Sequence, residues 1–432
     1  MRPASPHLAL AAALLLVALA PSAAAPAGAH PGVPAQDADL VGPATLSNVP
    51  CTDGFAATYP CQGIDLLSYI PHSKLGGGGG NDIWGWTDPQ TGHEYALVGK
   101  TNGTAFVDIT VPEDPLYLGL LPSHAATALL SSWRDVKVYE NHAYVVAEEP
   151  FHGMQVFDLT RLRGVTTPQS WTEDAHYPLQ GSAHNVAINE ETGYAYILGS
   201  GLVLGVGGCS GLHMVDIGDP TLPLPAGCFE LDGYTHDTQC VIYRGPDERF
   251  KDQEVCLNSN EDTLTIVDVT NKLLPEQISR TGYPGANYTH QGWLTEDHRY
   301  FLLGDEGDEQ GSGVNTTTYV FDVSNLTAPQ LIGTHRGRTR AIDHNLYIRD
   351  SLAYEANYTA GLQVYDIQGI SSGELREVAY FDLYPANDNP TFSGAWSNYP
   401  YFESGVVILN GMQQGLFTLR LDPEDFIPEP PA

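Results

Sequence analysis

The sequence predicts an all-β fold, a β-propeller with seven four-stranded blades. Six times a branched or aromatic run ends in Asp before another apolar residue, at Asp108, Asp158, Asp216, Asp268, Asp322 and Asp366. The intervals are 50, 58, 52, 54 and 44 residues, and a seventh, degenerate copy has Arg420 in the Asp position. A period near fifty residues, with about four short strands in each, is typical of a β-propeller.

The composition agrees with a fold of many short strands. Among 432 residues the chain has 23 Tyr, 45 Gly and 31 Pro, so strand-forming and turn-forming residues are both frequent. No long segment has apolar residues at helical spacing, so we expect little helix.

One repeat can be divided into four strands, expected over 239–244, 253–258, 263–269 and 277–283. In this division the recurring Asp ends the third strand, where its side chain can accept backbone hydrogen bonds in the following turn. We therefore interpret all six Asp residues as structural.

The last repeat contains only three of its four expected strands. An isolated strand near the N-terminus, Ile64–Ile70, resembles the fourth strand of the sixth repeat, Val378–Tyr384, and both are followed closely by Pro. We predict that this N-terminal strand completes the last blade, because closing the ring removes the open sheet edges.

The N-terminus has the pattern of an export signal. Arg2 is followed by an apolar core over 8–20 and small residues over 22–25, and no second long apolar segment occurs. We expect a signal peptide at 1–25, a disordered lead at 26–50, a Cys-bounded lead with the closing strand at 51–80, the propeller at 81–427 and a Pro/Glu tail at 428–432. The exported protein is expected to be a monomer without a membrane span, secreted, periplasmic or at the cell surface.

Six cysteines in an exported chain favour disulfides. Their grouping predicts three local bridges, Cys51–Cys61, Cys209–Cys228 and Cys240–Cys256. The alternative, a metal site made of Cys, lacks any Cys-x-x-Cys pair.

The formal net charge of −33 excludes two classes of partner. Nucleic acid and anionic lipid would both be repelled by such a surface. The acidity either attracts cations or basic ligands, or keeps the protein soluble in a salty medium.

Paired polar residues open the first strand of four repeats: His184-Asn185, His236-Asp237, His290-Gln291 and His344-Asn345. The equivalent place reads Arg134-Asp135 in the second repeat, lies near Trp396-Ser397 in the last, and lies near Trp84 in the first. First strands line the channel of a propeller, so these residues are expected to converge at one mouth of the channel. The candidates at that mouth are His184, Asn185, His236, Asp237, His290, Gln291, His344, Asn345, Arg134, Asp135, Trp396 and Asn357.

Imidazoles with carboxylates suit zinc, and carboxylates with amides suit calcium. The candidate ligands of a divalent metal are His236, His290, His344, Asp305, Glu306 and Glu148. The acidic loop over 305–309 is the most calcium-like stretch, and its other interpretation is a solvated acidic turn. The histidines can equally hold neighbouring blades together through backbone hydrogen bonds.

The chain resembles the choice-of-anchor B family, whose repeats are also named LVIVD. The resemblance covers about Cys51 to Leu421 and is carried most specifically by 84–89, 152–158, 235–240, 290–294 and 394–405, with Leu264–Asp268 (LTIVD) close to the naming motif. It implies a secreted or surface repeat protein, often followed by an anchoring domain. It implies no particular catalytic residues.

Three functions remain open on the sequence. The first is a non-catalytic exported propeller that binds a ligand, a metal or an extracellular protein at the channel mouth. The second is a metal-dependent lyase or hydrolase that uses the His and acidic residues. The third is a purely structural surface component. Neither Gly-x-Ser-x-Gly nor His-Glu-x-x-His occurs, which favours the first.

Overall fold

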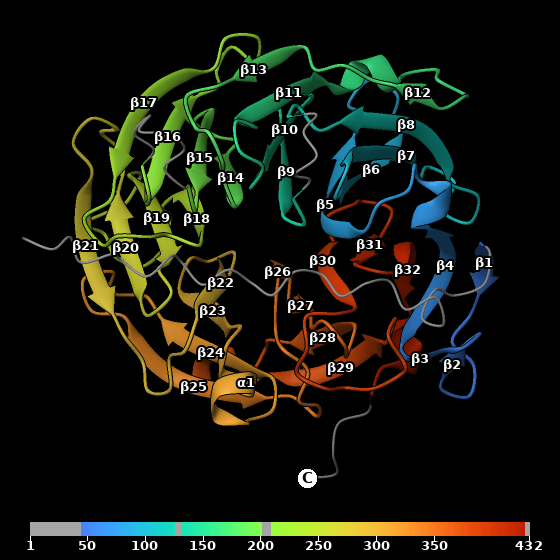
Figure 1. Ribbon diagram of the computed structural model, residues 1–432. Helices are drawn as coiled ribbons and strands as arrows, with labels where there is room; N and C mark the ends of the chain where they lie inside the picture. Colours follow the sequence, from blue (N-terminus) through green and yellow to red (C-terminus); the bar gives the residue numbers. More distant parts are fainter. Residues whose placement is uncertain (1–44, 126–130, 201–208, 428–432) are drawn as a thin grey trace, which may run out of the picture. The chain divides into compact units, whose positions relative to one another are not determined.

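The structure, a computed structural model, describes residues 45–125, 131–200 and 209–427. Within them, seven antiparallel four-stranded blades form a ring around a central channel (Figure 1). The predicted seven-bladed β-propeller is therefore confirmed. The predicted signal peptide at 1–25 and the tail at 428–432 lie outside the described residues.

Each blade is a sheet whose strands follow one another from the channel to the rim. The first three blades are β5 (Gly80–Thr87), β6 (Glu94–Lys100), β7 (Gly103–Asp108) and β8 (Leu116–Pro122); β9 (Arg134–Tyr139), β10 (His142–Ala147), β11 (Met154–Asp158) and β13 (Ala175–Tyr177); and β14 (Asn185–Asn189), β15 (Tyr194–Leu198), β16 (Leu212–Asp216) and β17 (Leu224–Phe229).

The remaining four blades follow the same order. They are β18 (Asp237–Ile242), β19 (Glu254–Ser259), β20 (Leu264–Asp268) and β21 (Glu276–Thr281); β22 (Thr289–Leu294), β23 (Tyr300–Asp305), β24 (Thr317–Asp322) and β25 (Gln330–Arg336); β26 (Leu346–Arg349), β27 (Leu352–Ala356), β28 (Leu362–Asp366) and β29 (Arg376–Phe381); and β30 (Ala395–Tyr399), β31 (Val406–Gly411), β32 (Gly415–Leu421) and β4 (Ile64–Pro71). The described helices are short: α1 (Asp308–Ser312) and the 3₁₀ turns His72–Lys74, Leu159–Leu162, Ile370–Ser372 and Pro423–Asp425.

The closing strand lies where the sequence predicted it. Strand β4 pairs antiparallel with β32 at seven positions, including Phe417 opposite Tyr69 and Leu419 opposite Leu66. The rings of Tyr69 and Phe417 stack with centroids 4.6 Å apart, and the hydroxyls of Ser68 and Thr418 are 2.7 Å apart. The N-terminal strand therefore completes the seventh blade, which also contains the last strands of the chain.

The segment before β4 adds strands to two blades. β1 (Leu46–Val49) pairs with β4, and β2 (Phe55–Ala56) pairs with β3 (Tyr59–Gln62), which extends the sixth blade by pairing with β29. The lead at 26–50 was expected to be disordered, but Leu46–Val49 is ordered because β4 offers it a free edge to pair with. A short β12 (Gln169–Ser170) extends the first blade by pairing in parallel with β8.

The six recurring Asp residues all have the structural role predicted for them. Each ends the third strand of its blade, and one of its carboxylate oxygens accepts the backbone N–H two residues later. The six donors are Thr110, Thr160, Gly218, Thr270, Ser324 and Gln368, with N···O distances of 2.8–3.0 Å. The Asp residue thus fixes the turn that leads to the fourth strand.

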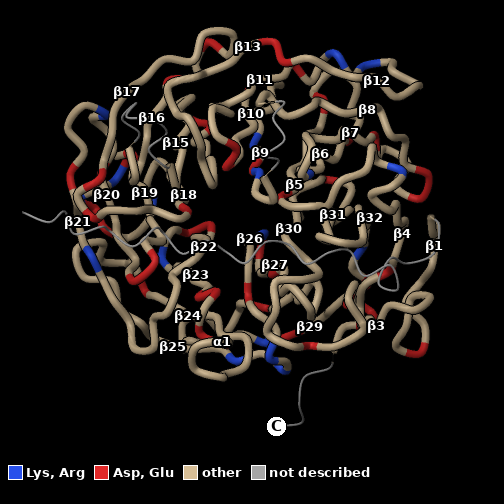
Figure 2. The backbone as a smooth tube through the Cα atoms, in the orientation of Figure 1, with Lys and Arg blue, Asp and Glu red and all other residues tan. Residues whose placement is uncertain are grey.

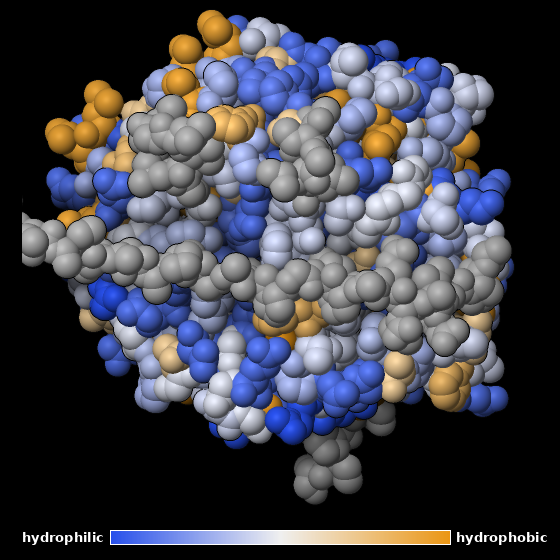
Figure 3. Space-filling view, viewed as in Figure 1, coloured by the Kyte–Doolittle hydropathy of each residue, from blue (hydrophilic) through white to orange (hydrophobic). Residues whose placement is uncertain are grey.

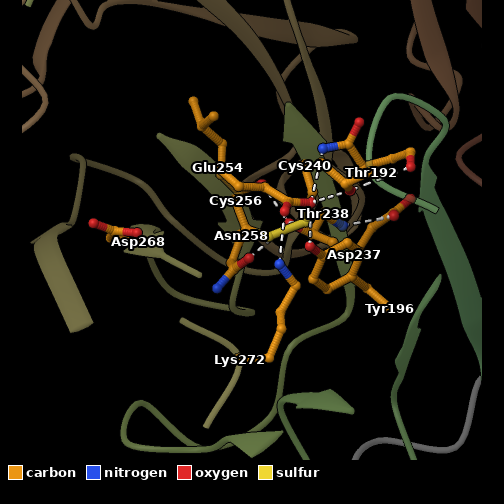
Figure 4. The surroundings of a disulfide bond; sticks show 12 residues. Thr192, Tyr196, Asp237, Thr238, Cys240, Glu254, Cys256, Asn258, Asp268 and Lys272 are labelled. Atoms are coloured by element: carbon orange, nitrogen blue, oxygen red, sulfur yellow. Dashed lines mark hydrogen bonds and ion pairs between the residues drawn. A yellow bond between two sulfur atoms is a disulfide. The ribbon is translucent and has the colours of Figure 1, made fainter. Parts of the chain in front are cut away.

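The three predicted disulfides are present: Cys51–Cys61, Cys209–Cys228 and Cys240–Cys256. The third joins directly opposed residues of β18 and β19 (Figure 4). Beside it, Thr238 donates a hydrogen bond to Asn258, and the buried carboxylate of Glu254 accepts hydrogen bonds from Tyr196 and Lys272.

The apolar core lies between neighbouring blades, where the faces of their sheets pack together. Phe106 and Phe157 of the first two blades stack, for example, with centroids 4.6 Å apart. Acidic residues are spread around the ring (Figure 2), and the face seen in Figure 3 is mostly hydrophilic, with separate apolar groups toward its edge. Among the described residues, no helix is long and apolar enough to cross a membrane.

Candidate functional site

Four imidazoles line one mouth of the channel, where the innermost strands of four consecutive blades begin. The ring centroids of His184 and His236 are 4.5 Å apart, those of His236 and His290 4.2 Å, and those of His290 and His344 4.4 Å. We call this end of the channel the histidine mouth. Trp396 continues the arc, with its ring centroid 5.0 Å from that of His344.

The histidines connect neighbouring blades. His236 Nδ1 lies 2.8 Å from the carbonyl oxygen of His290, and His344 Nδ1 hydrogen-bonds the carbonyl oxygen of Trp396. In both cases the acceptor is the equivalent residue of the next blade. Because a carbonyl only accepts, these Nδ1 atoms carry the proton, and Nε2 of a neutral ring then has the lone pair that a metal needs.

The residue after each histidine also bonds to the next blade in two cases. Asn185 donates to the carbonyl of His236 at 3.0 Å, and Gln291 exchanges two hydrogen bonds with the backbone of Leu346 at 2.9 and 3.0 Å. Asp135 accepts the backbone N–H of Val186 at 2.7 Å. These three side chains therefore hold the ring together.

The remaining two members of the pairs have other surroundings. Asp237 accepts the N–H of Thr238, and burial raises the pKa of its carboxyl to about 6. Asn345 is buried, and its backbone carbonyl accepts a hydrogen bond from the side chain of Asn398 in the last blade.

Two carboxylates face the histidines. Glu148 lies 2.6 Å from His184 Nδ1, and although burial lowers the pKa of this imidazole, the bond to Glu148 outweighs it, so the pKa is raised. Glu306 is buried among His290 Nε2 at 3.8 Å, His344 Nε2 at 3.5 Å and the Tyr358 hydroxyl at 2.6 Å. Burial raises the pKa of Glu306 to about 7.

His290, Glu306 and His344 have the geometry of a metal-ligand set. One ligand atom from each lies within 4.8 Å of the others. Two imidazoles and one carboxylate are a donor set found in catalytic zinc and non-haem iron sites.

Several predicted residues do not join this group. Asp305 lies in β23, but its oxygens already accept hydrogen bonds from Tyr283 and from backbone N–H groups. Asn357 donates to Glu355 at 3.0 Å. Arg134 is fully buried and pairs with Glu149 at 3.2 Å and with His152 at 2.9 Å, because the guanidinium points between blades instead of into the mouth.

In the first blade, the residue at the position of the four histidines is not Trp84 but Asn81, three residues earlier. The pairing of β5 with β6 shifts register between Gly80 and Ile83, which hides the correspondence in the sequence.

A cavity of about 390 Å³ extends from Asp237 and Gln291, directly after the mouth histidines, to Glu190 and Glu191 beyond the end of β14, toward the other end of the channel. It is lined by the residue three positions after the mouth position in every blade. These seven residues are Trp84, Lys137, Ala187, Gln239, Trp293, Tyr347 and Tyr399. Sequence reasoning missed this site, although the same register that aligned the histidines, read three residues later, would have found it.

Comparison with known proteins agrees with the fold. The LVIVD repeat model matches residues 132–149, which form the β9–β10 hairpin and include Arg134, Asp135 and Glu148. The match is therefore not at Leu264–Asp268, the stretch that looked closest to the naming motif. The repeat and the seven blades together fit the LVIVD-repeat propellers.

Three solved structures resemble the chain at low identity. A functionally unknown protein from Desulfotomaculum acetoxidans is 12% identical with a TM-score of 0.50, covering 76% of this chain and 90% of its own. The β-propeller domain of Cps50 (Swd1) from Myceliophteria thermophila is 12% identical with a TM-score of 0.47, covering 75% and 92%. A protein from Lactobacillus plantarum is 13% identical with a TM-score of 0.48, covering 76% and 87%. No curated protein matches the chain.

Proposed function

We propose that this protein is an exported, non-catalytic propeller that binds a small neutral ligand, a carbohydrate, in the cavity at the end of its channel opposite the histidine mouth. Export is supported by the three disulfides, and an assignment to the choice-of-anchor B family is part of the same proposal. The observation that carries the proposal is a cavity of about 390 Å³ to which all seven blades contribute the same strand position. Ligand pockets of a few hundred Å³ are of the size that holds a small molecule.

One wall of the cavity is aromatic. Trp293 packs edge-on against Tyr347 with centroids 5.0 Å apart, and Trp84 lies 5.6 Å from Tyr347 and 5.0 Å from Tyr399. Tyr401 extends this wall, 5.3 Å from Tyr399. Aromatic side chains supply large apolar surface with a fixed orientation, which suits the apolar faces of sugar rings.

The opposite wall is smaller and more polar. Ala187 makes room for a ligand, and Gln239, Glu190 and Asp237 bring amide and carboxylate groups to the same cavity. Such groups can donate to and accept from the hydroxyls of a ligand.

The charges of the cavity disfavour ionic ligands. The ammonium of Lys137 lies over the Trp84 ring at 4.6 Å and pairs with Asp82 at 3.2 Å and with Asp135, so it already occupies the aromatic face that a ligand cation would use. A ligand anion would meet Asp237 and Glu190. Since like charges repel strongly in a partly buried site, a neutral, hydroxyl-rich ligand is the class that fits.

The test is calorimetric titration of the exported protein with glucose, galactose, N-acetylglucosamine, maltose and cellobiose, beside choline and sulfate as charged probes. Trp293→Ala removes part of the aromatic wall, and Ala187→Phe fills the cavity. Both are expected to weaken sugar binding by about tenfold or more, which is about 1.4 kcal/mol.

Trp171→Ala is the matched control, because Trp171 is also partly buried but packs edge-on against Phe157 outside the channel, with centroids 5.5 Å apart. It is expected to bind sugar like the native protein. Binding of choline or sulfate without binding of any sugar would contradict the carbohydrate assignment. Equal loss in Trp171→Ala would contradict the location.

A second candidate function is favoured by one observation at the histidine mouth. His290, Glu306 and His344 would hold zinc, and such a metal could serve a lyase or hydrolase reaction. Elemental analysis of protein purified without chelator or affinity metal tests this. A stoichiometric metal that is lost in Glu306→Gln, but kept in Trp171→Ala, supports the enzyme. Protein with no metal, and no shift in melting temperature on adding zinc, rejects it.

A further inference from the structure

Three buried carboxylates meet between the fifth and sixth blades. Asp308 and Glu309 begin α1, on the connection after β23, and Asp343 comes just before His344 on the approach to β26 (Figure 1). Their exposed fractions are 2%, 0% and 0%. One oxygen from each carboxylate lies within 4.8 Å of the other two.

Most oxygens of this cluster lack a hydrogen-bond donor. Asp308 Oδ1, both oxygens of Glu309 and both oxygens of Asp343 are buried without a partner. The one oxygen with a partner is Asp308 Oδ2, which accepts from the Tyr319 hydroxyl at 2.8 Å. No Lys, Arg or His of the described residues forms an ion pair with any of the three carboxylates.

A neighbouring carboxylate, Asp305, is compensated by hydrogen bonds alone. Asp305, in the same acidic loop, accepts hydrogen bonds from the Tyr283 hydroxyl and from the N–H groups of Asn287, Tyr288 and Gly307 at 2.7–3.3 Å. The loop therefore separates into a satisfied carboxylate at Asp305 and unsatisfied ones at Asp308 and Glu309. It is not the solvated acidic turn that the sequence left open.

The backbone makes room for the cluster. Gly304 of β23 lies so close to Asp343 that a Cβ at this position would stand 2.0 Å from Asp343 Oδ2. Only a residue without a side chain allows the carboxylate of Asp343 to approach the strand in this way.

Three uncompensated negative charges cannot stay buried together at neutral pH. Removing a carboxylate from water costs several kcal/mol unless a charge or hydrogen bonds compensate it. The cluster therefore needs protons or a cation.

We propose that Asp308, Glu309 and Asp343 bind a calcium ion. The available donors are all oxygens, which excludes the nitrogen and sulfur ligands that zinc prefers. Glu309 and Asp343 each offer both oxygens, and calcium accepts bidentate carboxylates and irregular geometry, whereas magnesium requires a near-ideal octahedron. The five oxygens, with water, reach the six to eight ligands usual for calcium.

The ion would join two blades at the histidine mouth. Asp308 lies two residues after Glu306, and Asp343 directly precedes His344, so the site ties together the two chain segments that carry these residues. Exported modules bind calcium with dissociation constants of about 0.1–1 mM, which is sufficient outside the cell.

The experiment uses the full exported protein, freed of metal with EGTA and then exchanged into chelator-free buffer. Thermal unfolding is followed with no added metal, with 5 mM CaCl₂ and with 5 mM MgCl₂, and calcium is titrated calorimetrically. We expect one calcium ion per chain and a melting temperature raised by roughly 1–3 °C by calcium but not by magnesium. Terbium luminescence, excited through the Tyr319 that contacts Asp308, reports the same site.

The variants are Asp343→Asn and Glu309→Gln, with Asp382→Asn as the matched control. Asp382 is a carboxylate of the sixth-blade region that is only partly buried, and it accepts the N–H of Tyr384 at 2.7 Å. Each cluster variant is expected to bind calcium at least tenfold more weakly, whereas Asp382→Asn keeps the native affinity. Both cluster variants remove an uncompensated charge, so we expect them to be at least as stable as the calcium-free native protein.

Three results would overturn the proposal. One is a native protein whose unfolding does not respond to calcium and which shows no binding heat, because the cluster then holds protons instead of an ion. Another is an unchanged calcium response in both cluster variants, which places the ion elsewhere. The third is an equal response to magnesium, which removes the case for calcium.

Discussion

The ring of seven blades depends on a strand from the far end of the sequence, and its removal tests how the fold closes. A chain that begins at His72 lacks β4, whereas a chain that begins at Gly63 keeps β4 and lacks only β1, β2, β3 and the Cys51–Cys61 bridge. Both can be produced behind the same export leader. The comparison isolates the closing strand from the rest of the N-terminal lead.

The size of the effect follows from what β4 buries. Five of its apolar side chains are at most 7% exposed: Ile64, Leu66, Leu67, Tyr69 and Ile70. Burying each contributes about 1.5–3 kcal/mol, so the strand accounts for roughly 7–15 kcal/mol, which is the whole stability of a typical domain. The chain that begins at His72 would also expose the edge of β32, and an exposed strand edge promotes aggregation.

The assay is urea unfolding with size-exclusion chromatography. We expect the chain that begins at Gly63 to stay folded and monomeric with a lower midpoint, because it loses the buried Tyr59, and the chain that begins at His72 to be unfolded or aggregated. Leu66→Ala gives a graded version, with an expected cost of about 2–5 kcal/mol for a fully buried Leu. If the two truncated chains unfold at the same midpoint, the reasoning about closure is refuted.

Two further predictions concern a buried histidine and the repeated Asp. Burial, together with the charge of Lys100, lowers the pKa of His72 to about 3, so below its unfolded value of about 6.5 the unfolded state takes up a proton that the folded state does not. The stability that this neutral histidine contributes is therefore present above pH 6.5 and is lost as the pH falls. The loss of unfolding free energy caused by His72→Gln should be about 2 kcal/mol smaller at pH 5 than at pH 7. Equal losses at the two pH values in urea unfolding would contradict the assignment. Asp268→Ala removes the acceptor of the Thr270 N–H and should lower the free energy of unfolding by about 1 kcal/mol. Asp268→Asn keeps an acceptor and should lower it by less. If Asp268→Asn were the more destabilising variant, the charge of Asp268 would matter more than its hydrogen bond in the turn.

The fold could be predicted because the repeat is made of local contacts that recur in six of the seven blades. The Asp that ends the third strand of these blades bonds to an amide two residues away, so its role can be inferred without knowledge of distant contacts. The four strands expected for the fourth blade agree with β18 to β21 within two residues at each end. The three disulfides each close a short segment of chain, and their grouping was sufficient to pair them.

The sequence predicted the candidate site only in part. The common register of the four histidines placed them at one mouth, but the sequence could not say that Asn185 and Gln291 bond to the next blade. Arg134 has the same register, yet its guanidinium turns to Glu149. Strand period fixes the position of a Cα atom, whereas the direction of a long side chain depends on what its neighbours offer.

The sequence by itself therefore determined the number of blades, the closing strand, the disulfides and the end of the channel at which the histidines gather. Tertiary structure alone decided which side chains meet across blades, because those contacts join residues that are far apart in the sequence and depend on the packing of neighbouring sheets. Asp343 reaches Asp308 and Glu309 in this way, and the aromatic wall at the other end of the channel is built from four different blades. No local pattern along the chain encodes the meeting of the three carboxylates, whereas the aromatic wall follows the repeat register, three residues after the mouth position.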